Sequence, residues 1–188
     1  MPKKKQRNTK NRGRHQTAHF PTIQRILVPI DFSDSSVNAM RYGAGLASKV
    51  QAGLTILYVV PRDYGWLEIG KEAMREYDEA LQSQAAESLR ALAQDEIPAS
   101  ASVDLEIRIG RPAEEIVAAA AESKANLILL STHGHTGLDR LLIGSVADRV
   151  ARLAPCPVFL MRPGKSSPEP KKISPAILRF KHETKRGR

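Results

Sequence analysis

The sequence predicts an α/β protein with a central parallel sheet that is covered by helices on both faces. Short apolar segments alternate along the chain with longer segments in which apolar residues recur with a helical period. The short segments are typical of strands buried in a parallel sheet, and the longer ones of amphipathic helices. Strict alternation of the two favours parallel strands joined by right-handed crossovers. The chain has no internal repeat, so one domain of this kind is expected.

The predicted strands are short and apolar, and they cover residues 25–30, 54–60, 103–109, 126–131 and 158–161. The third differs from the others because Val103, Leu105 and Ile107 alternate with charged residues. Such alternation is typical of a strand with one exposed face. We therefore expect the third strand to be less completely buried.

Helices are predicted between the strands. The first begins within residues 31–35, a cluster of cap-type residues, and runs to about residue 49. Pro112 lies where a first helical residue can be proline, and Pro155 stops the last helix. Gly53 is expected to close the turn after the first helix. The other helices are predicted over residues 72–94, 112–123 and 145–153.

The charge of the chain is divided between a mildly acidic core and basic ends. The net charge of +9 combines +7 over residues 1–24, −4 over 25–162 and +6 over 163–188. Both ends lack hydrophobic periodicity, so we expect two basic disordered tails around one folded domain, residues 25–162. Lysine and arginine release counterions from a phosphate backbone, so the tails predict weak nucleic-acid association. The alternative is a solubilising extension.

No segment of the sequence is predicted to enter a membrane. No apolar run reaches the roughly 18 residues of a membrane helix. The basic N-terminus has no apolar block behind it, unlike a secretory signal. Cys156 is the only cysteine, which excludes an intrachain disulfide and fits a reducing compartment. We therefore expect a cytoplasmic protein.

Residues 127–150 have the pattern of a phosphate site. A buried strand precedes a loop that holds Gly134 and Gly137, and Gly144 and Ser145 then open a helix. Glycine lets the backbone approach a ligand closely, and a helix N-terminus offers N–H groups to an anion. Ligands of open parallel sheets bind beyond the carboxyl ends of the strands. That edge is expected to gather Asp31, Val59 and residues 131–137.

Other kinds of site have little support in the sequence. The chain contains neither a Walker-type G-x-x-x-x-G-K-[ST] loop nor a G-x-S-x-G nucleophile motif. His133 and His135 are the only histidines between residues 25 and 162, and no cysteine or acidic cluster has ligand spacing around them. The sequence therefore predicts a binding module without catalytic residues or a protein-held metal.

Several motifs follow one another in order along the core. They are ILVPIDFS at 26–33, LTILYV at 54–59, GRPA at 110–113, STHG at 131–134, GS at 144–145 and APCPV at 154–158. With these motifs residues 24–163 resemble the universal stress protein family of the UspA type. The resemblance implies a flavodoxin-like, Rossmann-like three-layer fold whose five parallel strands lie in the order 3-2-1-4-5. It also implies a homodimer formed through the last strand.

The same resemblance implies a phosphate site. Members that bind ATP carry G-x-x-G, nine further residues and then G-[ST], and this register falls on Ser131, Gly134, Gly144 and Ser145. Gly134 would lie against ribose and phosphate. Gly144, Ser145 and the N–H of Val146 would hold the phosphates. The implied ligand is ATP, with Mg²⁺ as a possible companion.

The nucleoside side of the implied site comes from the first two strands. Asp31 and Val59 would contact the nucleoside, and Pro29 would shape the pocket wall. Structural roles stay open for the same residues, because Asp31 could cap the first helix and Ser145 could be an N-cap. Gly134 could serve only the turn of its loop.

Ser131 departs from the pattern, since the first glycine of the motif is serine in this chain. If the backbone needs a positive φ there, serine costs roughly 1 kcal/mol or more. If the position needs only a small residue, serine suffices and its hydroxyl can bond a ribose.

The function predicted from these residues is that of a universal stress protein that binds an adenine nucleotide in a stress response. The alternative is a stress protein dimer that binds no nucleotide and engages nucleic acid or a partner through its basic tails. A slow ATPase or adenylyl transferase is a further alternative, although no general base or arginine finger can be identified.

Overall fold

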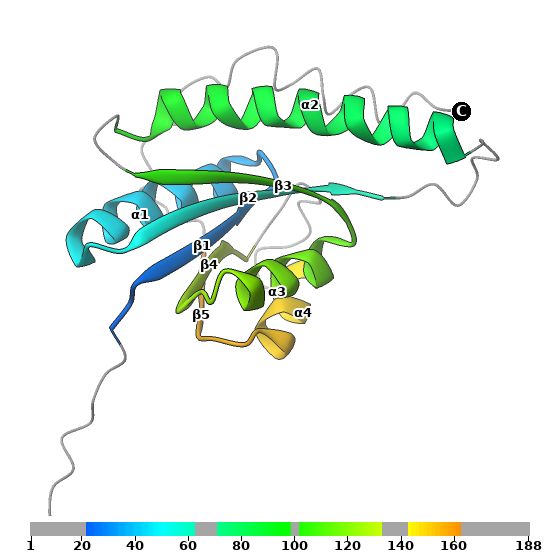
Figure 1. Ribbon diagram of the computed structural model, residues 1–188. Coiled ribbons are helices and arrows are strands. Elements are labelled where there is room, and N and C mark those ends of the chain that lie inside the picture. The colour runs from blue at the N-terminus through cyan, green and yellow to red at the C-terminus, as the bar shows by residue number, and fades with distance from the viewer. Residues whose placement is uncertain (1–21, 63–70, 99–101, 133–142, 163–188) are drawn as a thin grey trace, which may run out of the picture.

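Strands and helices alternate along the described chain in a computed structural model that covers residues 22–62, 71–98, 102–132 and 143–162 (Figure 1). The strands are β1 (Arg25–Ile30), β2 (Gly53–Pro61), β3 (Val103–Gly110), β4 (Leu127–Ser131) and β5 (Val158–Met161). The helices are α1 (Asp34–Val50), α2 (Lys71–Glu96), α3 (Pro112–Glu122) and α4 (Ser145–Leu153).

The sheet has five strands in the order β3-β2-β1-β4-β5, and every neighbouring pair is parallel. This confirms the predicted fold class and the strand order that the resemblance implied. Each connection between strands is a helix, as parallel pairing requires. β1 and β4 lie at the centre, where the connections change direction, so their carboxyl ends form the switch point of the sheet.

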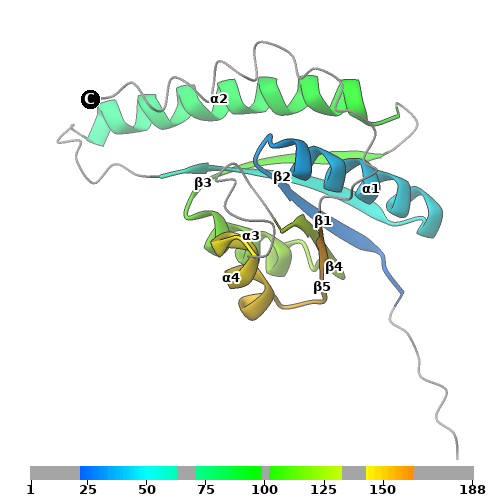
Figure 2. The ribbon, with the colours of Figure 1, turned by 180° about the vertical axis from the view of Figure 1, so that it is seen from behind.

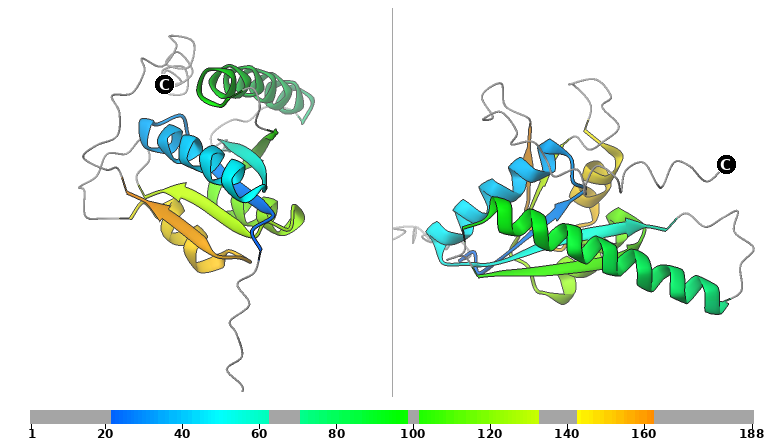
Figure 3. Two further views of the ribbon diagram at one scale, coloured as in Figure 1. Left: turned by 90° about the vertical axis from the view of Figure 1, so that its left-hand side faces the viewer. Right: turned by 90° about the horizontal axis from the view of Figure 1, so that it is seen from above.

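Two hydrophobic layers cover the faces of the sheet. Alternate residues of each strand point to opposite faces, so Ile26 and Val28 join one layer and Leu27 joins the other. The first layer lies under α1 and α2, and the second lies under α3 and α4. Figure 3 shows the sheet between the two helix pairs, and in Figure 2 α3 and α4 lie side by side.

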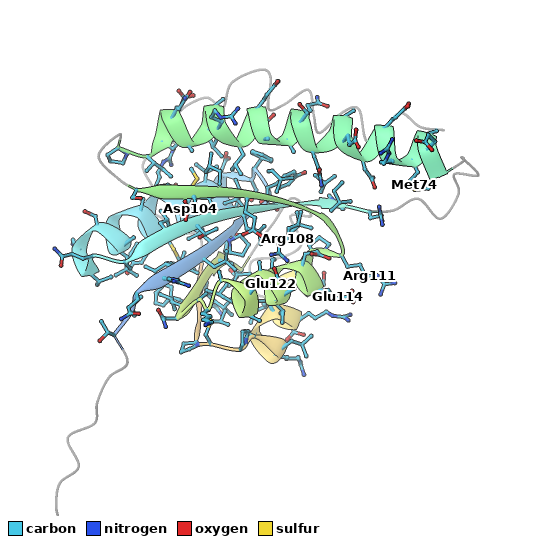
Figure 4. All side chains as sticks on the ribbon, viewed as in Figure 1. Met74, Asp104, Arg108, Arg111, Glu114 and Glu122 are labelled. Atoms are coloured by element: carbon cyan, nitrogen blue, oxygen red, sulfur yellow. The ribbon has the colours of Figure 1, made fainter. Side chains whose placement is uncertain are left out.

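β3 is less buried than the central strands, which confirms the expectation from its alternating pattern. It is an edge strand that pairs only with β2, and Leu105 is 38% exposed. Its other face carries Arg108, which forms ion pairs with Glu106 and Glu122 (Figure 4). Charged side chains of this kind oppose pairing with a second sheet.

The end of α1 differs from the expectation. Gln51 is the C-cap in the left-handed conformation, with φ 57° and ψ 39°, and its N–H donates to Ala47 O. Gly53 is instead the first residue of β2, where its N–H donates to Gln24 O at 2.8 Å. Non-glycine residues can occupy the left-handed region at a modest cost, so glycine was a misleading marker of the turn here.

α2 extends beyond the predicted 72–94 at both ends. Its second half is anchored by buried Ala85, Leu89 and Leu92, whereas Tyr77 in its first half is largely exposed. Within the residues that the structure describes, no helix has the length and apolar character of a membrane span.

Candidate functional site

The carboxyl ends of β1, β2 and β4 frame the candidate site. β1 pairs with β2 up to Ile30 opposite Tyr58, and with β4 from Ile26 opposite Leu127. At the other end of the sheet, Asn126 Oδ1 accepts the N–H groups of Gln24 at 2.8 Å and Arg25 at 2.9 Å. This contact fixes β1 against β4, so the segments after both strands emerge at the same edge.

Asp31 leads out of β1 and is held in a fixed orientation. Its Oδ1 accepts both the N–H of Ser33, at 3.0 Å, and the hydroxyl of Ser33. Its own N–H donates to Ser36 Oγ at 3.2 Å. Ser33, rather than Asp31, is the N-cap of α1, because the Ser33 hydroxyl accepts the N–H of Ser36. The half-buried Asp31 therefore precedes the N-cap of α1 and lies outside the helix, at the strand ends.

Phe32 turns the chain sharply between Asp31 and α1. Its φ of 62° lies in the left-handed region, which is strained for a bulky residue. Its buried ring packs edge-on against Tyr58 with ring centroids 4.6 Å apart. Packing against β2 thus holds a conformation that costs about 1–3 kcal/mol in isolation, at the point where Asp31 is presented.

Tyr58 reports on this environment through its pKa. Burial raises the pKa of the phenol from 10.0 to about 12, and the negative charge of Asp31 adds to the shift. The neutral phenol is therefore favoured in the folded state.

The stability of the fold is expected to fall at high pH because of Tyr58. Below about pH 10 the phenol is protonated in both states, and between pH 10 and 12 the unfolded chain loses the proton first. Each pH unit in that window costs about 1.4 kcal/mol of unfolding free energy. Urea unfolding at about pH 9 and about pH 11 should show this loss in the wild type and not in Tyr58→Phe. Tyr77→Phe, at a 46% exposed position of α2, is the control and should keep the wild-type loss. An equal loss in the wild type and in Tyr58→Phe would contradict the prediction.

β2 projects beyond β1 at this edge. The last β1–β2 pair is Ile30 with Tyr58, whereas β2 continues to Pro61, paired with Gly110 of β3. Val59 is therefore backed by β3 on one side, while β1 supplies no ladder partner on the other. Its side chain is buried in the layer under α3 and α4, so its backbone is the part that can face a ligand. Pro29 is a buried residue of β1, opposite Leu57.

Ser131 ends β4 and does not need a glycine conformation. The non-glycine residues with positive φ in the described chain are Phe32, Gln51 and Lys124, so Ser131 is outside that group. It pairs with Met161 of β5 and is partly buried. The backbone at this position therefore does not need the positive φ that would favour glycine.

Thr132 joins the end of β4 to the start of α4. Its N–H donates to Met161 O, and its carbonyl accepts the N–H of Gly144, both at 2.8 Å. The residue is 3% exposed. The sequence analysis missed this role because it depends on backbone atoms, although the position next to Ser131 is a weak signal for it.

Gly144 is the N-cap of α4, with φ −59° and ψ 149°. A Cβ built there would lie 3.3 Å from Thr132 O, so the glycine allows a close approach of two backbones. Because it has no side chain, Gly144 itself offers no cap group to the N–H groups of the first turn, to which Ser145 and Val146 belong. Ser145 is the first helical residue rather than the N-cap, so that structural role is excluded. Both Ser145 and Val146 are exposed.

Gly134 and the rest of residues 133–142 lie outside the described part of the chain. The proposed contact of Gly134 with ribose and phosphate therefore stays a prediction. The structure brings Asp31, Ser131 and the Gly144 helix start to one edge of the sheet, with Pro29 and Val59 on the flanking strands. Across the described residues, no group of three or more His, Cys, Asp or Glu side chains could hold a metal ion.

The fold and this edge define an α/β protein in which helix α4 begins at the switch point of the sheet. The profile of the universal stress protein family matches residues 22–162. Universal stress protein MJ0531 of Methanocaldococcus jannaschii is 33% identical over 150 residues, which cover 76% of this chain and 84% of that protein. The chain therefore belongs to the universal stress protein family.

Solved structures share the fold. The structure of hypothetical protein MJ0577 has a TM-score of 0.65 and 25% identity, and the match covers 77% of this chain and 99% of that one. A universal stress protein in complex with cAMP has a TM-score of 0.50 and 23% identity, over 74% of this chain and 97% of that one. The second likeness is one of fold alone.

Proposed function

We propose that this chain binds an adenine nucleotide, ATP, at the carboxyl ends of β1, β2 and β4 as part of a stress response. The observation that carries the proposal is the start of α4. Gly144 supplies no side-chain cap to the first-turn N–H groups, and Thr132 fixes that turn just beyond the end of β4. A phosphate at this place would gain hydrogen bonds and the favourable end of the helix dipole.

The nucleoside would lie between the β2 overhang and Asp31. The backbone of Val59 can face a ligand on the side where β1 has ended. The Asp31 carboxylate, which Ser33 holds in place, can accept a hydrogen bond from a ligand hydroxyl or amine. Ser131 is small and close to the same edge. Ser131, Gly144 and Ser145 match the positions of the motif that ATP-binding family members carry, which supports adenine as the base of the ligand. A protein of this fold in complex with cAMP supports the same base.

Magnesium would reach the site with the nucleotide. In the part of the chain that is described, the protein offers no three-residue cluster of metal-binding side chains. Mg²⁺ commonly keeps several waters and binds through substrate phosphates with one or two carboxylates. The proposal is therefore that any Mg²⁺ is held mainly by the phosphates, with Asp31 as the carboxylate that projects at this edge.

The experiment that tests the function has two parts. Mass spectrometry of the small molecules released from denatured, purified protein should find an adenine nucleotide, and calorimetric titration of the emptied protein with ATP should show saturable binding. Protein that carries no nucleotide and gives no heat with ATP would contradict the proposal. Turnover above the buffer background that is lost in Asp31→Ala would favour the ATPase alternative.

A homodimer through β5 and a cytoplasmic location belong to the same proposal, with residues 25–162 as the functional domain and the two basic ends as appendages. Among the described residues, β5 pairs with β4 alone, and it carries Phe159, which is 47% exposed. The Phe159 ring stacks on Tyr42 of α1 with centroids 5.8 Å apart. Two exposed aromatic rings beside an open strand edge are suited to burial against a second copy.

A charge at Phe159 is expected to break this dimer. Phe159→Glu should raise the dimer dissociation constant at least about tenfold, because a carboxylate would be buried without a partner. Sedimentation velocity over a concentration series measures the effect, and Tyr77→Glu, at an exposed position of α2, is the control. A wild-type chain that stays monomeric, or a Phe159→Glu variant as dimeric as the control, would overturn the proposed interface.

A further inference from the structure

A small group of charged side chains joins the start of α3 to α4. Glu114 Oε1 accepts from Arg149 Nη2 at 3.0 Å and lies 3.4 Å from Arg111 Nη1. Two guanidinium groups therefore share one carboxylate oxygen. We call Arg111, Glu114 and Arg149 the rim cluster. Both arginine side chains are more than half exposed, so a ligand could reach them.

The rim cluster lies on the same edge of the sheet as the start of α4. Arg111 is the N-cap of α3 and Glu114 belongs to its first turn, which follows the carboxyl end of β3 directly (Figure 4). Arg149 is on α4, four residues after Ser145, so the two share one face of the helix. Helical side chains lean toward the N-terminus, and the Arg149 guanidinium on that side reaches Glu114 in the first turn of α3.

The electrostatic balance of the cluster favours an anion. It holds two permanent positive charges and one carboxylate, so one positive charge is in excess within the cluster. Glu115, the other carboxylate of this turn, is paired with Arg108 of β3 instead, at 3.7 Å. Asp148 is the carboxylate of the same α4 turn, and Arg152 pairs with it through two contacts, at 3.0 and 3.1 Å. That second pair is neutral as a unit, so it does not cancel the excess charge beside Ser145.

We propose that Arg149 and Arg111 form a subsite for the distal phosphates of a polyphosphate chain whose first phosphate lies on the start of α4. The inference rests on the proposed function and adds a selectivity to it: triphosphates bind more tightly than monophosphates. Guanidinium groups suit this task, because their planar donors match phosphate oxygens. Glu114 positions both arginines and, without a ligand, competes with the phosphate for them.

The experiment compares ligands of different phosphate number on the full chain. Calorimetry at one ionic strength measures the dissociation constants of AMP, ADP, ATP and inorganic tripolyphosphate. Arg149→Gln should raise the dissociation constants of ATP and tripolyphosphate about tenfold and leave that of AMP unchanged. Glu114→Gln should tighten ATP severalfold, because both guanidiniums lose their competing carboxylate. The controls Arg90→Gln and Glu87→Gln change the charge equally at exposed positions of α2.

The outcomes separate this inference from the proposed function. The subsite is overturned if Arg149→Gln and Arg90→Gln show the same ratio of the ATP and AMP dissociation constants. It is also overturned if Glu114→Gln binds ATP more weakly than the wild type. Neither result affects the proposal that the chain binds a nucleotide. If tripolyphosphate binds in a manner that depends on Arg149 but ATP does not bind, the subsite is supported and the proposed nucleotide binding is overturned. A wild-type chain that binds neither overturns both. Circular dichroism and melting temperature confirm that each variant is folded.

Discussion

Replacing Gly144 with valine is expected to weaken ATP binding at least about a hundredfold while the protein stays folded. The Cβ alone would lie 3.3 Å from Thr132 O, and the branched methyl groups would cover the N–H groups of the first α4 turn. The backbone of Gly144, with φ −59° and ψ 149°, is open to any residue. The cost in stability is therefore that of a poorer N-cap, about 1 kcal/mol, together with the small shift that the contact of the Cβ with Thr132 O requires.

A serine at the same position separates binding from folding. The Gly144→Ser hydroxyl can accept an N–H of the first turn, as N-cap serines do, and so competes with the phosphate for it. The gain from a serine N-cap, a few tenths of a kcal/mol, is offset by the contact of the new Cβ with Thr132 O, whereas ATP affinity should fall about tenfold. Gly45→Ala is the matched control, because its Cβ would meet nothing within 4 Å on the exposed side of α1. Unchanged affinity in both Gly144 variants would mean that the phosphates lie elsewhere.

Truncating Leu129 is expected to have the largest effect on stability. The side chain is fully buried in β4, in the layer under α1, and β4 is paired with β1 on one side and β5 on the other. Leu129→Ala removes buried apolar surface and leaves a cavity between fixed neighbours, at a cost of about 2–5 kcal/mol. Chemical denaturation should show a lower midpoint with an unchanged slope.

The control for Leu129→Ala is Leu153→Ala, which shortens a 52% exposed side chain at the end of α4. It should lower the unfolding free energy by less than about 1 kcal/mol. ATP affinity of the folded fraction should be the same in both variants, since neither side chain reaches the strand ends. Similar losses at Leu129 and Leu153 would contradict the packing of β4 under α1.

Much of the fold could be predicted because each strand and helix has a strong local pattern. The buried strands have uninterrupted apolar segments, and the alternation of charged residues around Leu105 correctly indicated a less completely buried strand. The strand order came from the resemblance, since alternation alone does not choose among orders. The end of α1 was misjudged because Gln51, rather than glycine, adopts the left-handed conformation.

Less of the candidate site could be predicted. Serine at 131 left two possibilities open, and only the path of β4 shows that its φ is ordinary. The role of Asp31 was equally open, and the hydrogen bonds from Ser33 remove it from the cap of α1. Both questions depend on backbone geometry, which residue types do not specify.

By itself the sequence determined the alternation of elements, the family motifs and the glycine that opens α4, because these depend on neighbours along the chain. Tertiary structure decided what the motifs present: the overhang of β2 past β1, and the contact of Thr132 with Gly144. It also decided that Glu114 of α3 is shared with Arg149 of α4. The physical reason is that these features join segments far apart in sequence, and strand register and helix packing alone set the distances between them.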